Sequence, residues 1–394
     1  MELIRRFFLP PQESFFLFGP RGTGKSTFVR QSFPKAVYLD LLDPERVRSL
    51  SAMPERLREI VQVHSGPGHV VIDEIQRVPD LLMVVHSLIE SQKGWTFVLT
   101  GSSARKLKRT GVNLLGGRAL LHTLHPFMVA ELGENFDLGK ALRYGLLPVV
   151  LSSENPAEVL RSYAALYLRE EVQMEGLVRN IGNFSRFLEA ISFSQASILN
   201  ISNVARECEV ERKVVEGYVG ILEDILLGWR LPVFTKRAKR KLSVHPKFYF
   251  FDAGVFRALR PQGPLDRPEE TEGQALEGLV AQHLRAWSAY SRAKPELFYW
   301  RTQSGVEVDF VVYGPEGLWA LEVKNAQKIY PADLRGLKSF QEEFPHSKAL
   351  LLYRGQDRLK KDKILCLPCQ DFLQNLRPDQ SLDDTLSSPF PSLK

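Results

Sequence analysis

Short apolar runs alternate with helical patterns through the first third of the chain. Four of these runs have the length and composition of buried strands: residues 15–19, 36–40, 69–72 and 95–100. Helical patterns lie between them, for example at 54–63 and 80–92. Strands that alternate with helices predict an α/β fold with a parallel sheet and helices on both faces. In such a sheet, ligands bind at the carboxyl ends of the strands.

The pattern changes after residue 127, where helical segments dominate. Helical patterns at 158–175 and 183–192 precede two helices and a strand, at 201–208, 211–224 and 227–233. Two helices joined by a short polar turn and followed by a strand are typical of a winged helix-turn-helix. The middle of the chain is therefore predicted to hold a helical domain of this kind.

A stretch rich in proline, glycine and acidic residues, at 261–273, is the clearest linker. A third pattern begins there, with a helix that ends near residue 286. Four strands follow, with a helix at 333–344 between the last two: residues 297–301, 306–313, 318–324 and 348–353. This order predicts a mixed α/β domain, and the polar, proline-containing residues from 378 onward predict a loose tail.

Basic residues slightly outnumber acidic ones. There are 52 lysines and arginines against 46 aspartates and glutamates, which gives a net charge of +6 and an isoelectric point of about 9.1. This balance permits an anionic partner such as nucleic acid but does not require one. Seven basic residues follow the predicted winged helix: Arg230, Lys236, Arg237, Lys239, Arg240, Lys241 and Lys247. They form either a solvated hairpin or a wing that contacts phosphates.

The apolar runs and the cysteines both indicate the cellular compartment of the protein. No apolar run approaches the roughly 18–20 residues needed to span a bilayer. The apolar run near the N-terminus is too short for a secretory signal, so a cytoplasmic protein with no membrane partner is expected. Three cysteines, Cys208, Cys366 and Cys369, are too few for a disulfide framework and are expected to be packing residues.

A phosphate-binding loop is the most specific motif. Residues Gly19 to Ser26 fit the pattern G-x-x-x-x-G-K-[ST], between a strand and a helix. Glycines let backbone N–H groups face phosphate oxygens, and the following helix adds its positive dipole end. Lys25 is expected at the β- and γ-phosphates, and Ser26 is expected to bind Mg²⁺. The predicted nucleotide contacts are Gly19, Pro20, Arg21, Gly22, Thr23, Gly24, Lys25, Ser26 and Thr27.

Two further strand ends carry polar residues that suit nucleotide hydrolysis. Asp73 ends the third strand, where it can hold Mg²⁺ through water, and Glu74 can polarise the attacking water. The next strand ends in Thr-Gly-Ser-Ser, so Ser102 or Ser103 is expected to sense the γ-phosphate. Arg118 follows two glycines. It is either an arginine finger that reaches the γ-phosphate in a neighbouring subunit or a surface arginine without such a role.

The order of these motifs resembles the prokaryotic AAA+-type ATPases that carry a C-terminal domain of unknown function. The phosphate loop, the D-E-I-Q run at 73–76, the T-G-S-S run at 100–103 and the G-G-R run at 116–118 carry the resemblance. Gly116 stands where that family commonly has alanine. The segment 247–253 (KFYFFDA) resembles the family's joint between the winged helix and the last domain. The resemblance implies ATP and Mg²⁺ as cofactors and a homo-oligomer, with a hexameric ring as the expected form.

The C-terminal domain carries a second group of acidic residues. Glu277 lies on its first helix, Asp309 on a strand, and Glu322 and Lys324 on one face of the next strand. This spacing resembles the PD-(D/E)xK nuclease superfamily, although Val308 stands where the motif has proline. The resemblance implies Asp309 and Glu322 as Mg²⁺ ligands and Lys324 as the residue that positions water. Whether the domain cuts DNA or only binds it stays open.

The sequence therefore predicts an α/β protein in five parts. These are a P-loop core at 1–130, a helical connector at 131–180, a winged helix at 181–260, a nuclease-like domain at 273–376 and a loose tail at 377–394. The leading functional hypothesis is an ATP-driven motor that translocates on or remodels branched DNA. The alternatives are an ATP-dependent switch that binds a protein partner, or a metal-dependent nuclease licensed by ATP.

Overall fold

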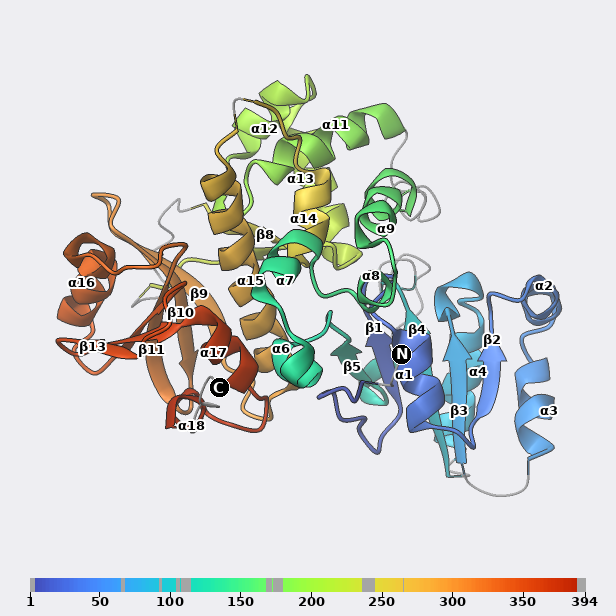
Figure 1. Ribbon diagram of the computed structural model, residues 1–394. Coiled ribbons are helices and arrows are strands. Elements are labelled where there is room, and N and C mark those ends of the chain that lie inside the picture. Colours follow the sequence, from blue (N-terminus) through green and yellow to red (C-terminus); the bar gives the residue numbers. More distant parts are fainter. Residues whose placement is uncertain are drawn as a thin grey trace. The chain divides into compact units, whose positions relative to one another are not determined.

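The computed structural model in Figure 1 divides into two compact units. The first, here called the P-loop unit, comprises residues 8–125 with 224–227, and the second, the C-terminal unit, comprises residues 1–7, 126–223 and 228–394. The structure describes residues 4–64, 68–91, 94–103, 107, 115–167, 172, 180–235, 245–264 and 266–387.

A five-stranded parallel sheet forms the P-loop unit. Its strands are β1 (Phe15–Phe18), β2 (Val37–Asp40), β3 (Gly68–Asp73), β4 (Trp95–Gly101) and β5 (Leu120–Thr123), in the spatial order β2-β3-β4-β1-β5. Phe18, the last residue of β1, pairs with Gly101 of β4 and Thr123 of β5. The carboxyl ends of the strands therefore meet at one edge of the sheet. The predicted parallel α/β fold is confirmed.

Helices that accompany this sheet in the described part of the unit include α1 (Lys25–Ser32), α2 (Pro44–Ala52), α3 (Arg56–Gln62) and α4 (Leu81–Glu90). Their starts follow local rules, since Gly24 precedes α1 and Asp43 caps α2 by accepting from the Glu45 N–H, with Pro44 at its first position. Apolar side chains of α3 and α4, such as Leu57 and Leu82, join Phe16 and Ile72 in one buried cluster. Burial of these apolar side chains stabilises the sheet that carries the predicted nucleotide-binding motifs.

The middle of the chain is helical, as predicted. It contains α6 (Val129–Leu132), α7 (Leu138–Tyr144), α8 (Pro148–Leu151) and α9 (Pro156–Ser162), followed by a π-helical turn at Tyr163–Tyr167. The helix expected at 158–175 is thus present as α9 and this turn, and residues 168–171 and 173–175 lie outside the described part of the chain.

A winged-helix arrangement follows. Its elements are α11 (Ile181–Ser192), β6 (Ser197–Ile198), α12 (Ile201–Glu207), α13 (Arg212–Asp224), β7 (Gly228–Leu231) and β8 (Lys247–Phe250). The three strands form an antiparallel sheet in the order β6-β8-β7, so the last strand lies in the middle. Asn200 caps α12 by accepting from the Asn203 N–H. Residues 236–244, which include most of the basic stretch, lie outside the described residues.

The last part of the chain is a mixed α/β domain. Helices α14 (Ala253–Leu259) and α15 (Pro268–Tyr290) lead into a six-stranded sheet. Its strands are β9 (Glu296–Arg301), β10 (Glu307–Gly314), β11 (Gly317–Lys324), β12 (Lys348–Tyr353), β13 (Leu359–Lys361) and β14 (Ile364–Pro368). The order is β13-β14-β12-β11-β10-β9. The β9-β10-β11 pairs are antiparallel, and β12 and β14 run parallel to β11.

Three details of this domain refine the predictions. Helix α15 begins at Pro268, so part of the expected linker at 261–273 is helical. Helix α16 (Arg335–Glu343) confirms the helix expected at 333–344 and follows a 3₁₀ turn at Pro331–Leu334. The prediction of a loose tail is wrong for the stretch that forms α18 (Leu382–Ser387), because Leu382, Thr385 and Leu386 are buried there. The polar tail contains too few apolar residues for their spacing to predict this helix.

The described part of the chain contains neither a candidate membrane span nor a disulfide. None of its helices has the length and apolar character needed to cross a bilayer. All three cysteines are free and buried, as expected of packing residues.

Candidate functional site

The phosphate loop has the backbone that its glycines predict. Gly22 and Gly24 have φ angles of 81° and 85°, in the left-handed region that favours glycine. Lys25 starts α1 and is buried, and its Nζ donates to the carbonyl oxygens of Gly19 (2.6 Å) and Pro20 (3.1 Å). The ammonium group thus lies inside the loop, where it can meet a phosphate.

Close packing holds the start of the loop. A Cβ atom on Gly19 would lie 2.5 Å from the Leu124 carbonyl oxygen, so a larger residue does not fit there. The Thr23 hydroxyl donates to the Pro20 carbonyl oxygen at 2.7 Å and closes the turn. Among the other predicted nucleotide contacts, Ser26 is half-buried, whereas Arg21 and Thr27 are exposed. The shape of the loop is therefore fixed by the Thr23 hydrogen bond within it and by the close approach of Leu124 to Gly19.

Asp73 is buried at the end of β3, where hydroxyl groups from both neighbouring strands reach it. Tyr38 of β2 donates to one carboxylate oxygen and Thr100 of β4 donates to the other. Burial, together with the hydrogen bond to Asp73, raises the pKa of Tyr38 well above its usual value. Tyr38 therefore stays a hydrogen-bond donor, and the orientation of the Asp73 carboxylate is fixed from two sides.

Glu74 follows Asp73 in an uncommon backbone conformation, with φ of 62° and ψ of 46°. Non-glycine residues in this left-handed region are uncommon and often lie at functional sites. Its backbone N–H donates to the Thr100 hydroxyl at 3.2 Å, and its carboxylate accepts from the Gln76 side-chain amide at 2.5 Å. The turn thus places the acid directly after Asp73, the predicted Mg²⁺ ligand.

Gln76 links this acid to the predicted sensor strand. Its amide also donates to the Ser102 hydroxyl at 3.3 Å. A Cβ on Gly101 would lie 2.5 Å from the Gln76 Oε1 atom, so the glycine makes room for this side chain. Gln76 was not predicted as a site residue, although its place in the D-E-I-Q run was a signal.

The sequence left Ser102 and Ser103 as equal candidates for the sensor. Both are buried, but Ser102 is the one that Gln76 joins to Glu74. The Ser103 hydroxyl has no hydrogen-bond partner within the described part of the chain. The geometry therefore favours Ser102 for a role tied to the acid and leaves Ser103 available for another contact.

The residues at this edge of the sheet fit Mg²⁺ bound together with a nucleotide. Ser26 offers a direct oxygen ligand, whereas Asp73, whose two oxygens already accept from Tyr38 and Thr100, would hold the ion through water. The described residues contain no group of three or more His, Cys, Asp or Glu side chains that could hold a metal ion unaided. This is consistent with an ion that takes most of its remaining ligands from phosphates and water.

Arg118 lies at the other end of the strands. It precedes β5, whose first residue Leu120 pairs with Phe15 at the start of β1, whereas the phosphate loop follows the end of β1. Its guanidinium forms an ion pair with Glu90 at the end of α4, and 41% of its side chain is exposed. With about 3.3 Å per strand residue, the sheet is too long for Arg118 to reach the loop of its own chain.

The C-terminal unit brings Glu277 and Asp309 together, as predicted, around a residue that was not predicted. Lys247, the first residue of β8, places its Nζ 3.1 Å from Glu277, 3.0 Å from Asp309 and 2.6 Å from Glu307. Tyr249 donates to the same Glu277 oxygen at 2.7 Å. Lysine thus lies at the centre of a group of carboxylates, and its side chain is only 2% exposed.

The two expectations for the basic stretch, a solvated hairpin or a phosphate-contacting wing, are both wrong for Lys247. It is buried and ion-paired inside the protein. Arg230 is exposed but engages Glu223 through two hydrogen bonds of 2.8 and 2.5 Å. The signal that distinguishes Lys247 is its place at the head of an apolar run, Phe248 to Phe251, which indicates a buried strand.

Glu322 and Lys324 pair with each other on β11, at 2.6 Å. Burial, and then the nearby Asp309 charge, raises the pKa of Glu322 to about 8 and that of Glu277 to about 7. Burial works to lower the pKa of Lys247, but Glu277 and the other surrounding acids outweigh it and hold that pKa well above its usual value. The lysine is therefore a permanent cation.

Mg²⁺ does not fit the predicted ligands Asp309 and Glu322 in this arrangement. Both Asp309 oxygens already accept hydrogen bonds, one from Lys247 and the other from the Val323 N–H at 2.9 Å. One Glu322 oxygen is held by Lys324, and only its Oε2 atom is buried without a hydrogen-bond partner among the described residues. A single such oxygen falls short of the several that Mg²⁺ requires.

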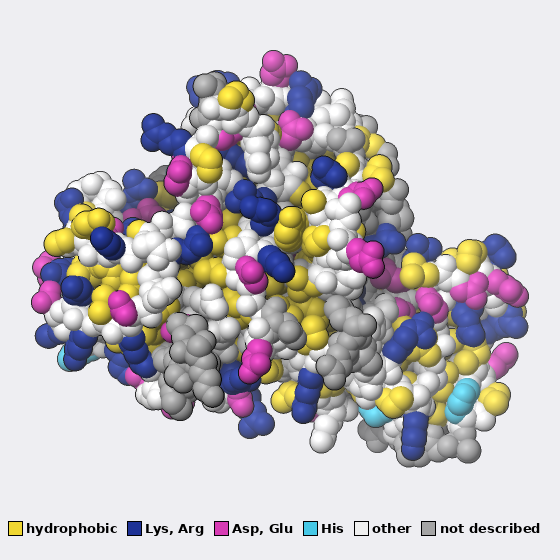
Figure 2. Space-filling model, viewed as in Figure 1, with side chains coloured by type: hydrophobic (Ala, Val, Ile, Leu, Met, Phe, Trp, Pro, Cys, Tyr) yellow, Lys and Arg dark blue, Asp and Glu magenta, His cyan; other side chains and the backbone are white. Residues whose placement is uncertain are grey.

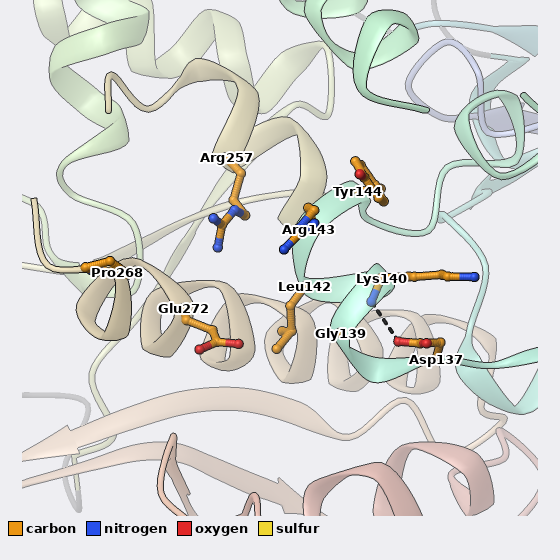
Figure 3. Close-up of a pocket in the computed structure, with 9 residues that line it drawn as sticks. All are labelled: Asp137, Gly139, Lys140, Leu142, Arg143, Tyr144, Arg257, Pro268 and Glu272. Atoms are coloured by element: carbon orange, nitrogen blue, oxygen red, sulfur yellow. Dashed lines mark hydrogen bonds between the residues drawn. The ribbon is translucent and has the colours of Figure 1, made fainter. Parts of the chain in front are cut away.

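A cavity of about 420 Å³ in the C-terminal unit contains none of the predicted site residues. In Figure 3, Arg143 of α7 and Arg257 of α14 point toward the same space as Glu272 of α15, whereas Lys140 points away. Burial lowers the pKa of Arg257, the charge of Glu272 opposes this effect, and the charge of Arg143 adds to it. Charges of both signs line this cavity, so it has no single preference for an anion or a cation.

Three family models match successive parts of the chain. Residues 11–133 match a model described as an AAA domain. Residues 135–266 and 272–372 match two domains of unknown function, DUF8612 and DUF4143. The uncharacterized proteins Mb2031c of Mycobacterium bovis and Rv2008c of Mycobacterium tuberculosis are each 26% identical over 378 residues, which is 93% of this chain and 82% of each relative.

Two solved structures align with the chain at low similarity. One is PH0952 from Pyrococcus horikoshii, a Signal Transduction ATPase with Numerous Domains and a tetratricopeptide repeat sensor, with 13% identity and a TM-score of 0.20. That alignment covers 70% of this chain but less than half, 45%, of the Pyrococcus protein. The other is VC1899 from Vibrio cholerae, with 11% identity, a TM-score of 0.23 and coverage of 87% and 96%.

Neither structural alignment is close enough to bear on function. The family model, the strand order and the motif geometry agree on the first part of the chain. Residues 11–133 form an AAA-type P-loop ATPase domain.

Proposed function

We propose that this protein hydrolyses ATP and uses the energy to act on DNA, by translocation or remodelling. The proposal rests on one observation, which is that a single chain holds a phosphate-loop site and a winged-helix sheet in the order β6-β8-β7. In helix-turn-helix proteins, the second helix of the pair enters the major groove of DNA. Here that helix is α13.

The residues of the P-loop unit divide the chemistry of hydrolysis among them. The loop and Lys25 would hold the phosphates, while Ser26 and Asp73 would hold Mg²⁺, which neutralises charge on the phosphates when bound. Glu74 would orient the attacking water, and Gln76 keeps that carboxylate in place through its 2.5 Å hydrogen bond. Ser102 would contact the γ-phosphate or the water from the next strand.

Helix α13 has an exposed face that suits close approach to DNA. Arg212 and Lys213 are exposed at its start, where recognition helices commonly contact DNA. Further along the helix, Gly217 and Gly220 have open space where a side chain would be. On the face of the molecule in Figure 2, lysine and arginine side chains are dispersed among acidic ones. DNA affinity is therefore expected to depend on a few local contacts.

Arg118 supports a homo-oligomer, of which a hexameric ring is the form we propose. Because it lies at the amino end of β5, it cannot serve the site of its own chain. Arginine fingers in P-loop ATPases often come from a neighbouring molecule and stabilise charge in the transition state. In that role Arg118 would exchange Glu90 for the γ-phosphate of the next subunit.

The C-terminal domain enters the proposal as a nuclease-like module that helps to hold DNA. Its helix α15, antiparallel strands β9-β10-β11, helix α16 and parallel strand β12 follow one another in the order expected of a nuclease-like core. Fold alone does not carry an activity. The proposal therefore assigns it DNA association rather than cutting.

Two measurements test the proposal. The rate of ATP hydrolysis should rise when single-stranded, duplex or four-way DNA is added, and Lys25→Ala should abolish hydrolysis in every case. Lys213→Ala should weaken DNA binding and reduce its salt dependence by about one phosphate contact. The matched control is Lys363→Ala, an exposed lysine in the β13–β14 turn. Hydrolysis indifferent to all three DNAs, with equal DNA affinity for both lysine variants, would overturn the proposal.

A further inference from the structure

We propose that Lys247 is an internal cation that takes the place of a metal ion in the acidic cluster of the nuclease-like domain. The cluster then fastens the winged helix to that domain without a metal and does not cleave nucleic acid. This inference concerns the C-terminal unit alone and does not rest on DNA as the target of the ATPase.

The Lys247 ammonium group lies among carboxylates. It lies within 3.1 Å of carboxylate oxygens from three residues, Glu277, Asp309 and Glu307. Asp309 on β10 is a residue that the nuclease resemblance predicts as a Mg²⁺ ligand, and Glu277 on α15 is the helix glutamate of the same motif. The ammonium group of this buried lysine thus makes the close contacts with carboxylate oxygens that a metal ion would otherwise make.

Groups other than Lys247 also hold these carboxylates. Asp309 accepts from the Val323 N–H at 2.9 Å, Tyr249 donates to Glu277 at 2.7 Å, and Arg301 lies 3.2 Å from Glu307. A divalent ion could use Asp309 only after displacing the lysine or the backbone contact. Mg²⁺ sheds its own water reluctantly, so the competition favours the tethered ammonium.

The fold also holds Lys247 in place. Its strand β8 is the middle strand of the winged-helix sheet, bonded to β6 on one side and β7 on the other. The Tyr249 ring lies 5.8 Å from that of Phe310 on β10, and the Tyr299 hydroxyl donates to the His245 carbonyl at 2.5 Å. The backbone that carries Lys247 is therefore held on both sides, and the side chain itself is buried in the cluster.

Packing against α15 reinforces this joint. The Gln195 side chain accepts from the Phe250 N–H of β8 at 2.8 Å. A Cβ on Gly278 of α15 would lie 2.2 Å from the Nε2 atom of the same glutamine. The helix that carries Glu277 and the strand that carries Lys247 are therefore locked together by close contact as well as by charge.

The test is a Mn²⁺ titration of the nucleotide-free full-length protein, followed by electron paramagnetic resonance. We expect the unaltered protein and Asp309→Asn to give the same titration, because neither has a metal site in this cluster. Lys247→Met removes the cation at similar volume and should create a site at least about tenfold tighter, which the double variant with Asp309→Asn loses again. The matched control Lys338→Met, an exposed lysine of the same domain, should bind as the unaltered protein does.

Three outcomes would overturn the inference. One is Mn²⁺ binding by the unaltered protein that Asp309→Asn abolishes. Another is a folded Lys247→Met that gains no Mn²⁺ site. The third is nicking of supercoiled plasmid by the unaltered protein with Mn²⁺ that Asp309→Asn abolishes. The first and third need only the unaltered protein and Asp309→Asn, so the inference stays testable even if Lys247→Met does not fold.

Discussion

The side-chain amide of Gln76 lies 2.5 Å from the carboxylate of Glu74 and also donates to the Ser102 hydroxyl. This one residue therefore connects the acid that follows β3 with the polar segment that follows β4. Glu74 reaches its position through a left-handed backbone conformation that costs on the order of 1–3 kcal/mol. A side chain that captures the carboxylate offsets part of that cost and limits where the acid can point.

Replacing Gln76 with alanine should lower kcat for ATP hydrolysis and leave KM for ATP unchanged. The carboxylate of Glu74 would lose its orienting donor, and displacement of a catalytic group by about 1 Å can cost on the order of a hundredfold. Steady-state kinetics at saturating and limiting ATP separate the two effects. The matched control is Gln62→Ala at the exposed end of α3. A raised KM at constant kcat would show instead that Gln76 acts in nucleotide binding.

Adding a single methyl group next to Gln76 should have the same effect. In Gly101→Ala the new Cβ would lie 2.5 Å from the Gln76 Oε1 atom, so the amide must move away from Glu74. We expect the double variant with Gln76→Ala to be no slower than either single variant, because both act through one contact. Gly263→Ala, in a loop with ordinary van der Waals space, is the control. Losses that multiply would mean that Gly101 acts independently of Gln76.

The arrangement of the candidate ATP site was largely predictable because its parts are local in sequence. A phosphate loop is contiguous in sequence, and Asp73, Glu74 and Ser102 each follow an apolar run that reads as a strand. Parallel strands bring those ends together without further information. Tyr38 could not be found in this way, because its contact with Asp73 depends on β2 lying beside β3. Spatial strand order is a property of the whole sheet.

The C-terminal cluster shows a different limit. Glu277 and Asp309 were found from spacing, since a helix followed by a strand hairpin is a local pattern. The partner that neutralises them, Lys247, comes from a strand of the winged helix some 30 to 62 residues earlier. The apolar run after Lys247 indicates a buried strand, but the carboxylates that make burial of the lysine possible lie far away in the sequence.

Stability of the C-terminal unit should fall as the solution is made acidic, in part through His283. Burial lowers the pKa of this histidine from 6.5 to about 4, and its Nε2 atom accepts from the Val129 N–H at 2.9 Å. Between these two pKa values, His283 therefore binds a proton in the unfolded chain but not in the folded chain. The stabilisation is fully present above pH ~6.5 and is lost as pH falls toward ~4, by up to about 3 kcal/mol.

His283→Gln isolates this contribution. The variant should be less stable than the unaltered protein at pH 7.5, and the difference should shrink as pH falls through the window from about 6.5 to 4. Thermal unfolding at several pH values measures it. Glu277 and Glu322, whose raised pKa values act in the opposite direction, are present in both proteins and cancel in the comparison. Parallel pH curves for the two proteins would show that His283 is not the source.

Mixing two inactive variants should restore ATP hydrolysis if Arg118 serves a neighbouring subunit. Lys25→Ala removes a site but keeps the arginine, and Arg118→Ala keeps the site but lacks the arginine. In randomly mixed equimolar rings, about one interface in four joins an intact site to an intact Arg118, so roughly a quarter of the normal rate should return. Arg48→Ala, an exposed arginine of α2, should be fully active. A mixture no faster than its components, or an Arg118→Ala protein that is fully active alone, would exclude the finger role and leave Arg118 as the surface partner of Glu90.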